Sequence, residues 1–177
     1  MTDVLEDHRR ACDGFTEVAH AVNGAWEGPS PCSDWDARGV LEHVIGFHDV
    51  LLLRPLEAKP ARPKDDPEAR WTLTVDALFA ALARPGVLTA ERASLLGYLT
   101  TDVLVHTWDL AKAVGAEVTL DERLCQVGLD RAVANRARFE ASDMFAGPVP
   151  VPDYASVQDR LLGLFGRDPG WQPPPRS

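Results

Sequence analysis

Apolar residues recur every three or four positions along most of the chain, and clusters of proline and glycine separate the stretches that have this spacing. Such spacing is typical of amphipathic helices, whereas the strict alternation that is typical of strands is nearly absent. The pattern predicts helices over residues 4–22, 33–54, 71–83, 89–114, 121–140 and 156–165. We therefore expect an all-α fold.

Capping signals mark the ends of several predicted helices. Ser33 followed by Asp36 resembles a capping box at the start of the second helix, and Thr89 is a typical N-cap for the fourth. Gly24 and Gly115 follow the first and fourth helices, and glycine commonly ends a helix at this position. These signals support the boundaries that the apolar spacing predicts.

Two segments rich in proline separate the predicted helices. Residues 55–70 contain four prolines and many charges, which predicts a long exposed loop, and the alternating prolines of residues 147–152 exclude a helix there. The second predicted helix is apolar around most of its circumference. We therefore expect it to be buried on most sides.

Two polar side chains interrupt the apolar stripe of the fourth predicted helix. At about 100° per residue, Asp102 lies roughly 20° from the direction of Leu95, and His106 lies at a similar small angle from Leu99. Both side chains therefore point inward if the leucines do. Burial of an unpaired carboxylate costs several kcal/mol, so hydrogen bonds, an opposite charge or a shared metal ion must offset that cost.

A metal site built on Asp102 and His106 needs a third ligand from another helix, and the second predicted helix offers two histidines. Helical periodicity slightly favours His48, because His43 lies on a different face. Spacing alone leaves both histidines open. His8 and His20, on the first predicted helix, have no suitable partner nearby in the sequence, and we expect ordinary surface or core roles for them.

Charge and cysteine content argue against several classes of function. A formal net charge of −9 without a cluster of lysine and arginine deprives nucleic-acid binding of its usual electrostatic attraction. Three cysteines without Cys-x-x-Cys spacing argue against a disulfide framework and against a thiolate zinc site. The acidic N-terminus is unlike a signal peptide, and no apolar run is long enough to span a membrane.

From these features we expect a single domain over residues 1–177, with a tail over about residues 166–177. We expect the protein to be cytoplasmic, to be a monomer or a homodimer, and to act on small molecules.

Two segments of the chain resemble a known family. Residues 31–43, Pro-Cys-Ser-Asp-Trp-Asp-Ala-Arg-Gly-Val-Leu-Glu-His, and residues 102–111, Asp-Val-Leu-Val-His-Thr-Trp-Asp-Leu-Ala, are similar to motifs of the mycothiol-dependent maleylpyruvate isomerase metal-binding domain. Residues 145–152 and 166–171 are similar to a small-protein branch of the same family, so the resemblance covers nearly the whole chain. It implies a DinB-like four-helix bundle with extra short C-terminal helices.

The resemblance also implies a ligand set. In the family, the histidine eight residues after the tryptophan binds a metal ion, and an acidic residue and the histidine four positions later supply the other two ligands. These positions are His43, Asp102 and His106 in this chain. The chain departs from the isomerase in having Asp102 in place of glutamate, which shortens the reach of that ligand. It is also expected to lack the additional C-terminal domain of the isomerase.

Two imidazoles and a carboxylate suit Zn²⁺ or Ni²⁺, and also Fe²⁺ or Co²⁺. The function implied by the resemblance is a transferase or an isomerase that uses a small thiol such as mycothiol with an electrophilic substrate. The alternative is a metal-binding or regulatory bundle without enzymatic activity. A purely structural alternative has Asp102 and His106 bonded to each other, fixing a helix crossing.

Four further residues of these motifs have more than one interpretation. Asp109 either orients a ligand histidine or forms an ordinary salt bridge with a lysine or arginine. Cys32 precedes a helix N-terminus, where the helix dipole favours a thiolate, although a buried and inert thiol is the commoner outcome. Trp35 and Trp108 are predicted to be core aromatics rather than substrate contacts.

Overall fold

The computed structural model describes residues 4–135 and 147–174, and every regular element in these two ranges is a helix. The elements are α1 (Val4–Ala21), α2 (Ala37–His48), the short π-helix η1 (Asp49–Leu53), α3 (Pro67–Leu82), α4 (Ala90–Ala113), α5 (Glu122–Ala134) and α7 (Val157–Leu164). The predicted all-α fold is confirmed, and the DinB-like form of the bundle stays a prediction. None of the described helices is long and apolar enough to cross a membrane.

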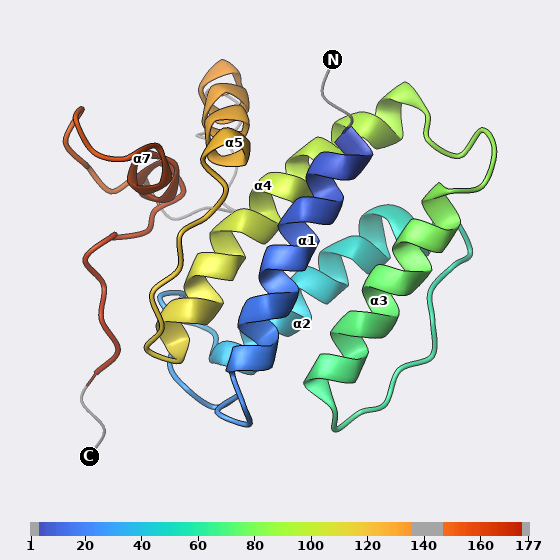
Figure 1. The fold of residues 1–177 in the computed structure, drawn as a ribbon, viewed down its shortest axis with the longest axis horizontal. Coiled ribbons are helices and arrows are strands. Elements are labelled where there is room, and N and C mark those ends of the chain that lie inside the picture. The colour runs from blue at the N-terminus through green and yellow to red at the C-terminus, as the bar shows by residue number, and fades with distance from the viewer. Residues whose placement is uncertain (1–3, 136–146, 175–177) are drawn as a thin grey trace.

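The longest helix, α4, runs through the middle of the molecule (Figure 1). α1 lies alongside α4, α2 packs against both α4 and α3, and α3 also contacts α1. On the other side of α4 from α3, α5 packs against α4 and α7 packs against α5 (Figure 1). Because α2 and α4 are in direct contact, side chains from these two helices can meet.

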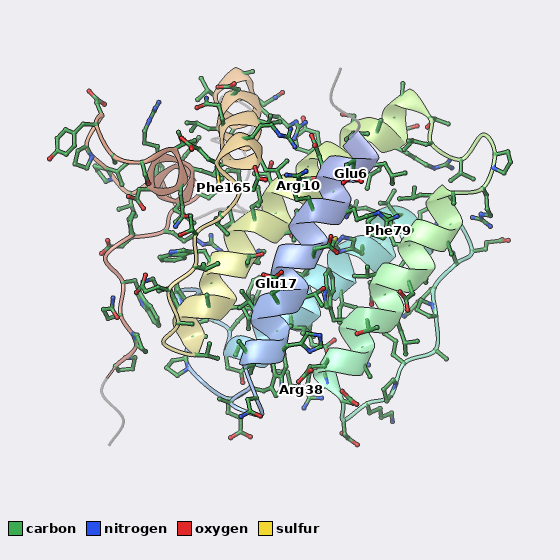
Figure 2. All side chains as sticks on the ribbon, in the orientation of Figure 1. Glu6, Arg10, Glu17, Arg38, Phe79 and Phe165 are labelled. Atoms are coloured by element: carbon green, nitrogen blue, oxygen red, sulfur yellow. The ribbon has the colours of Figure 1, made fainter. Side chains whose placement is uncertain are left out.

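The two faces of α1 show how the apolar spacing forms the core. Glu6, Arg10 and Glu17 lie on its exposed face, and Phe79 of α3 lies toward α1 (Figure 2). The ring of Phe79 contacts the guanidinium of Arg9, whose Cζ lies 3.9 Å from the ring centroid. The opposite face of α1 is buried and contributes these residues to the main core: Ala11, Cys12, Phe15, Val18 and Ala19.

The predicted start of the second helix at Ser33 is wrong, because the side chain of Asp36 is the N-cap and accepts a hydrogen bond from Gly39 N at 2.7 Å. The backbone N–H of Trp35 donates to Cys32 O at 3.0 Å, so residues 32–35 form a turn instead of a first helical turn. The predicted burial of this helix is confirmed, with Val50 as an exposed exception.

The third helix begins one turn earlier than predicted. Asp66 is its N-cap and accepts from Ala69 N at 2.9 Å, and Pro67 occupies the first turn, where no backbone N–H is needed. The sequence pattern predicts a loop at Pro67, because proline usually breaks a helix. The loop between the second and third helices therefore ends at Asp66 rather than at Arg70.

The other predicted boundaries agree with the structure where it describes them. Thr89 caps α4, and Gly115, just beyond its end, has a φ of +74°. Asp121 and Ser156 cap α5 and α7. Residues 147–152 are not helical, as predicted, and residues 136–140 of the predicted fifth helix lie outside the described residues.

Gly163 of α7 allows a close approach between this helix and the segment before it. A Cβ at this position would lie 2.8 Å from Val149 O and 2.9 Å from Cγ1 of Val151. Gly163→Ala is therefore expected to lower the free energy of unfolding by about 1–3 kcal/mol through overpacking. Urea denaturation followed by circular dichroism measures this change.

Gly14 provides the matched control, because it lies inside α1 and a Cβ there meets no atom within 4 Å. Gly14→Ala is expected to raise the free energy of unfolding by about 0.5–1 kcal/mol, since alanine has the higher helix propensity. Equal stability of the Gly163→Ala and Gly14→Ala variants would contradict the close contact at α7.

Candidate metal centre

The three residues of the predicted ligand set lie together between α2 and α4. His43 is on α2, and Asp102 and His106 lie one turn apart on α4. Oδ1 of Asp102 is 3.5 Å from Nε2 of His43 and 3.5 Å from Nε2 of His106. One donor atom from each side chain lies within 4.8 Å of the other two. Of the two histidines on the second helix that spacing left open, His43 is therefore the one that faces Asp102 and His106.

The separations around Asp102 fit ligands of a single ion better than hydrogen bonds. They exceed the usual N–H···O separation of about 2.7–3.2 Å. A tetrahedral zinc ion with bonds of about 2.0–2.2 Å to nitrogen and oxygen holds its ligand atoms about 3.4 Å apart. Oδ2 of Asp102 is also buried and has no hydrogen-bond partner in the described part of the chain. The donor set therefore fits a divalent cation, which would satisfy a carboxylate that the protein itself leaves incompletely paired.

Two aromatic rings hold the imidazole of His43. Trp35 stacks on it with the ring centroids 4.4 Å apart and an interplanar angle of 29°, and the centroid of Phe47 is also 4.4 Å away. Trp35 is predicted to be a core aromatic, but it lies in the turn before α2 and only its inner side packs against the core. Trp108 is buried in the core, as predicted.

The other ring nitrogen of His106 is fixed by Asp109. Nδ1 of His106 donates to Oδ2 of Asp109 at 2.9 Å, which leaves Nε2 directed toward Asp102. Asp109 is completely buried and also accepts from Nη2 of Arg167 at 2.7 Å. Both interpretations of Asp109 therefore hold, because it orients the histidine and pairs with an arginine. Arg167 follows α7, and no local pattern in the sequence links it to this site.

The ionisation of this group follows from burial and from neighbouring charges. Burial alone would raise the pKa of Asp102, but the charge of the neighbouring His106, and then the nearby ring of His43, outweigh it and hold that pKa below its usual value. Burial alone would lower the pKa of His106, but the charge of Asp102 holds it well above the usual value. A metal ion that binds Nε2 of His106 therefore has to compete with a proton that the pair with Asp102 stabilises.

Cys32 lies beside Asp109 and His106 and lines the same cavity as the three predicted ligands. Its thiol donates to Oδ2 of Asp109 at 3.2 Å, and Nη2 of Arg167 donates to its sulfur at 2.9 Å. It is half-buried and precedes the first residue of α2 by five positions, so it is not at the helix N-terminus. Cys32, His106 and Asp109 are also close enough to bind an ion, but Arg167 already supplies the cation that this group needs.

A cavity of about 270 Å³ adjoins the three predicted ligands. Aromatic, thiol, carboxylate, imidazole and guanidinium groups all contribute to its wall. The lining residues are Pro31, Cys32, Ser33, Asp34, Trp35, His43, Phe47, Asp102, His106, Gly166 and Arg167.

A second group of metal-binding side chains, which the sequence pattern did not reveal, lies in the core. His8, Cys12 and His48 are completely buried and close enough to share one ion. His8 has a core position, as expected, but the sequence pattern misses its partners, because its Nε2 lies 3.0 Å from Nε2 of His48 and 3.5 Å from the sulfur of Cys12. The four-residue spacing of His8 and Cys12 on the apolar face of α1 was the available signal. His20 is exposed and bonds to Glu68, as expected for a surface histidine.

The fold and the site together define an all-helical protein with a candidate metal centre between two of its helices. The chain is 33% identical over 183 aligned residues to two proteins from strains of Mycobacterium tuberculosis, "Uncharacterized protein Rv0738" and "Uncharacterized protein MT0763". The alignment covers 93% of this chain and 98% of each relative, and the chain belongs to the same family as these mycobacterial proteins. No family model matches the chain, and no solved structure matches it.

Proposed function

We propose that this chain binds a divalent ion, Zn²⁺ or Ni²⁺, and uses a small thiol such as mycothiol in a transfer or isomerisation reaction on an electrophilic small molecule. One observation carries the proposal: His43, Asp102 and His106 converge beside a cavity, and one buried oxygen of Asp102 has no protein partner in the described residues. The resemblance to the mycothiol-dependent maleylpyruvate isomerase metal-binding domain, a DinB-like bundle, supports the same ligand set.

The number of ligands favours an open site. Three protein donors are fewer than the four of a closed structural zinc site, so a position is left for a small molecule. A divalent ion held there would lower the pKa of a thiol or of a water molecule, which supplies a nucleophile at neutral pH.

The surrounding residues prepare this site for a small organic substrate. Trp35 and Phe47 hold the ring of His43 and give the cavity an apolar wall. Asp109 keeps Nε2 of His106 directed inward by binding its Nδ1. The apolar wall suits the carbon skeleton of a substrate, and the ligand side suits its reacting polar group.

The same proposal places the protein in the cytoplasm. All three cysteines, Cys12, Cys32 and Cys125, are free thiols. Free thiols persist in a reducing compartment, which is also where a reduced small thiol is available.

Calorimetric titration with mycothiol tests the proposal. We expect binding to the zinc-loaded protein, no binding after chelation of the ion, and no binding to a His106→Ala variant. A His20→Ala variant is the control, because His20 is exposed and lies on α1 outside the candidate site. Equal binding of the thiol with and without the ion would contradict the proposal. Zinc binding without thiol binding would favour the non-catalytic metal-binding protein.

A further inference from the structure

The buried group of His8, Cys12 and His48 is chemically different from the candidate metal centre. It has two imidazoles and a thiol but no carboxylate, and all three side chains are completely buried. His8 and Cys12 lie one turn apart on α1, and His48 is the last residue of α2. Nitrogen and sulfur donors without oxygen select soft metal ions.

Each imidazole in this group has a polar contact at its Nδ1, and the two Nε2 atoms face each other. Nδ1 of His48 donates to Val44 O at 2.7 Å, and Nδ1 of His8 lies 3.1 Å from the hydroxyl of Thr100. The two Nε2 atoms are 3.0 Å apart, and the sulfur of Cys12 is 3.5 Å from Nε2 of His8. A backbone or side-chain bond at one ring nitrogen, with the other directed at a shared point, is the usual arrangement of histidines that bind metal ions.

Apart from the thiol hydrogen of Cys12, whose sulfur lies 3.5 Å from Nε2 of His8, the hydrogens in this group point away from the space between the rings. The hydroxyl of Thr100 has a single hydrogen and lies closer to Leu96 O, at 2.7 Å, than to Nδ1 of His8, at 3.1 Å, so the shorter contact favours donation to Leu96 rather than to His8. Nδ1 of His8 then donates to Thr100, and Nε2 of both rings carries a lone pair. Two lone pairs that face each other at 3.0 Å repel, and a cation between them removes the repulsion.

We propose that His8, Cys12 and His48 bind a monovalent copper ion, Cu⁺, in the core between α1 and α2. The charge selects this ion: when Cu⁺ replaces the thiol proton of Cys12, which passes to the solvent, the ion and the thiolate together are neutral. Zn²⁺ in the same place would leave one positive charge that the group itself does not compensate, at a large cost in solvation, because Asp102 acts on both imidazoles but is not one of the residues that share this site.

The number and the spacing of the donors also suit Cu⁺. Structural Zn²⁺ takes four ligands, whereas this closed group offers three and has no exposed side for a fourth. Bonds of about 2.0–2.3 Å, the values for nitrogen and sulfur on zinc, place ligand atoms roughly 3.3–3.8 Å apart. The imidazoles need to separate by only a few tenths of an ångström to reach this spacing. Because the group is closed, the ion enters while the chain folds.

Copper retention by the refolded full chain tests this proposal. The protein is refolded without oxygen in the presence of Cu⁺ and then challenged with the Cu⁺ chelator bicinchoninate. We expect one copper per chain, with sulfur scattering in the copper X-ray absorption spectrum. Loss of a residue that only hydrogen-bonds a metal ligand typically lowers the affinity for the metal by roughly 10- to 100-fold. Cys12→Ala removes a ligand itself, so we expect a larger loss of affinity for copper.

Cys125→Ala is the matched control, because Cys125 is also completely buried but belongs to no metal-binding group in the described part of the chain. His48→Gln tests the proposal independently if the Cys12→Ala variant does not refold, and it is also expected to lose copper. Copper lost to the chelator by the wild type, or retained equally by Cys12→Ala, would overturn the proposal. The group would then be a hydrogen-bonded network in which Thr100 donates to His8.

The zinc content of the same samples separates this result from the proposed function. Cys12→Ala is expected to leave zinc at His43, Asp102 and His106 unchanged, because this residue is not among those ligands. Loss of zinc from His106→Ala, together with retained copper, would show two independent sites.

Discussion

Zn²⁺ at a thousandfold excess over its dissociation constant is expected to raise the free energy of unfolding by about 4 kcal/mol, because an ion that binds only the folded chain stabilises it by mass action. For a chain of this size, the increase corresponds to a rise of roughly 8–16 °C in Tm. His106→Ala removes one of three ligands and is expected to abolish this rise. Differential scanning calorimetry of both proteins, with and without Zn²⁺, measures it.

His20→Ala is the control for this experiment, since it removes an imidazole that is exposed on α1. The pH dependence gives a second check. The pKa of His106 is held above its usual value in the metal-free protein, so more of the sites carry a proton as the pH falls, and Zn²⁺ must displace it. The zinc-dependent rise in Tm should therefore shrink below neutral pH. A rise that is equal in the wild type and in His106→Ala would contradict the assignment of His106 as a ligand.

Asp109→Asn is expected to lower the free energy of unfolding by about 3–5 kcal/mol, because it leaves the guanidinium of Arg167 without its buried carboxylate. Asp109 also orients His106, so the affinity for Zn²⁺ should fall by about 10- to 100-fold. Chemical denaturation and competition with a zinc chelator measure the two effects separately.

The double variant Asp109→Asn with Arg167→Met separates the two roles of Asp109. Removal of the unpaired charge should restore much of the stability, whereas the affinity for Zn²⁺ should stay low because His106 has still lost its carboxylate partner. Recovery of both properties would show that Asp109 acts only through Arg167.

The free energy of unfolding of the wild type, measured as the pH is lowered, shows how the ionised carboxylate of Asp109 affects stability. Burial alone would raise the pKa of Asp109, but the hydrogen bonds from His106 and Arg167 hold it below the usual value. Its contribution to stability is therefore present above the pKa of an unfolded aspartate and is lost as the pH falls through the lower folded pKa. Asp109→Asn should remove this part of the acid-induced loss of stability.

Local patterns predict the described α-helices and the inward direction of two of the three candidate ligands, but they misplace the starts of α2 and α3. The apolar period and the cap at Thr89 predict elements that the structure contains, and the helix starts predicted at Asp121 and Ser156 are the N-caps of α5 and α7. The inward direction of Asp102 and His106 follows from 100° per residue alone, because both residues lie on one helix.

Local spacing does not predict which residues of other helices contact Asp102 and His106. Periodicity slightly favoured His48, which does point into the core, but toward His8 on α1 rather than toward Asp102. Packing angles between helices decide which of two inward faces meets a given neighbour, and single-helix periodicity does not contain them. The resemblance to a known family selected His43, and the structure brings this residue to Asp102 and His106.

Arg167 follows α7, far along the chain from Asp109, and this separation has a consequence for synthesis of the protein. Asp109 and its only arginine partner in the described residues are separated by 58 positions, so a nascent chain holds Asp109 long before Arg167 leaves the ribosome. Until then the carboxylate has no guanidinium to neutralise it, and closing the helices around it costs more free energy. Assembly of the site should thus wait until α7 and Arg167 have been synthesised, and proteolytic removal of α7 and Arg167 should disable it without touching any of the three predicted ligands.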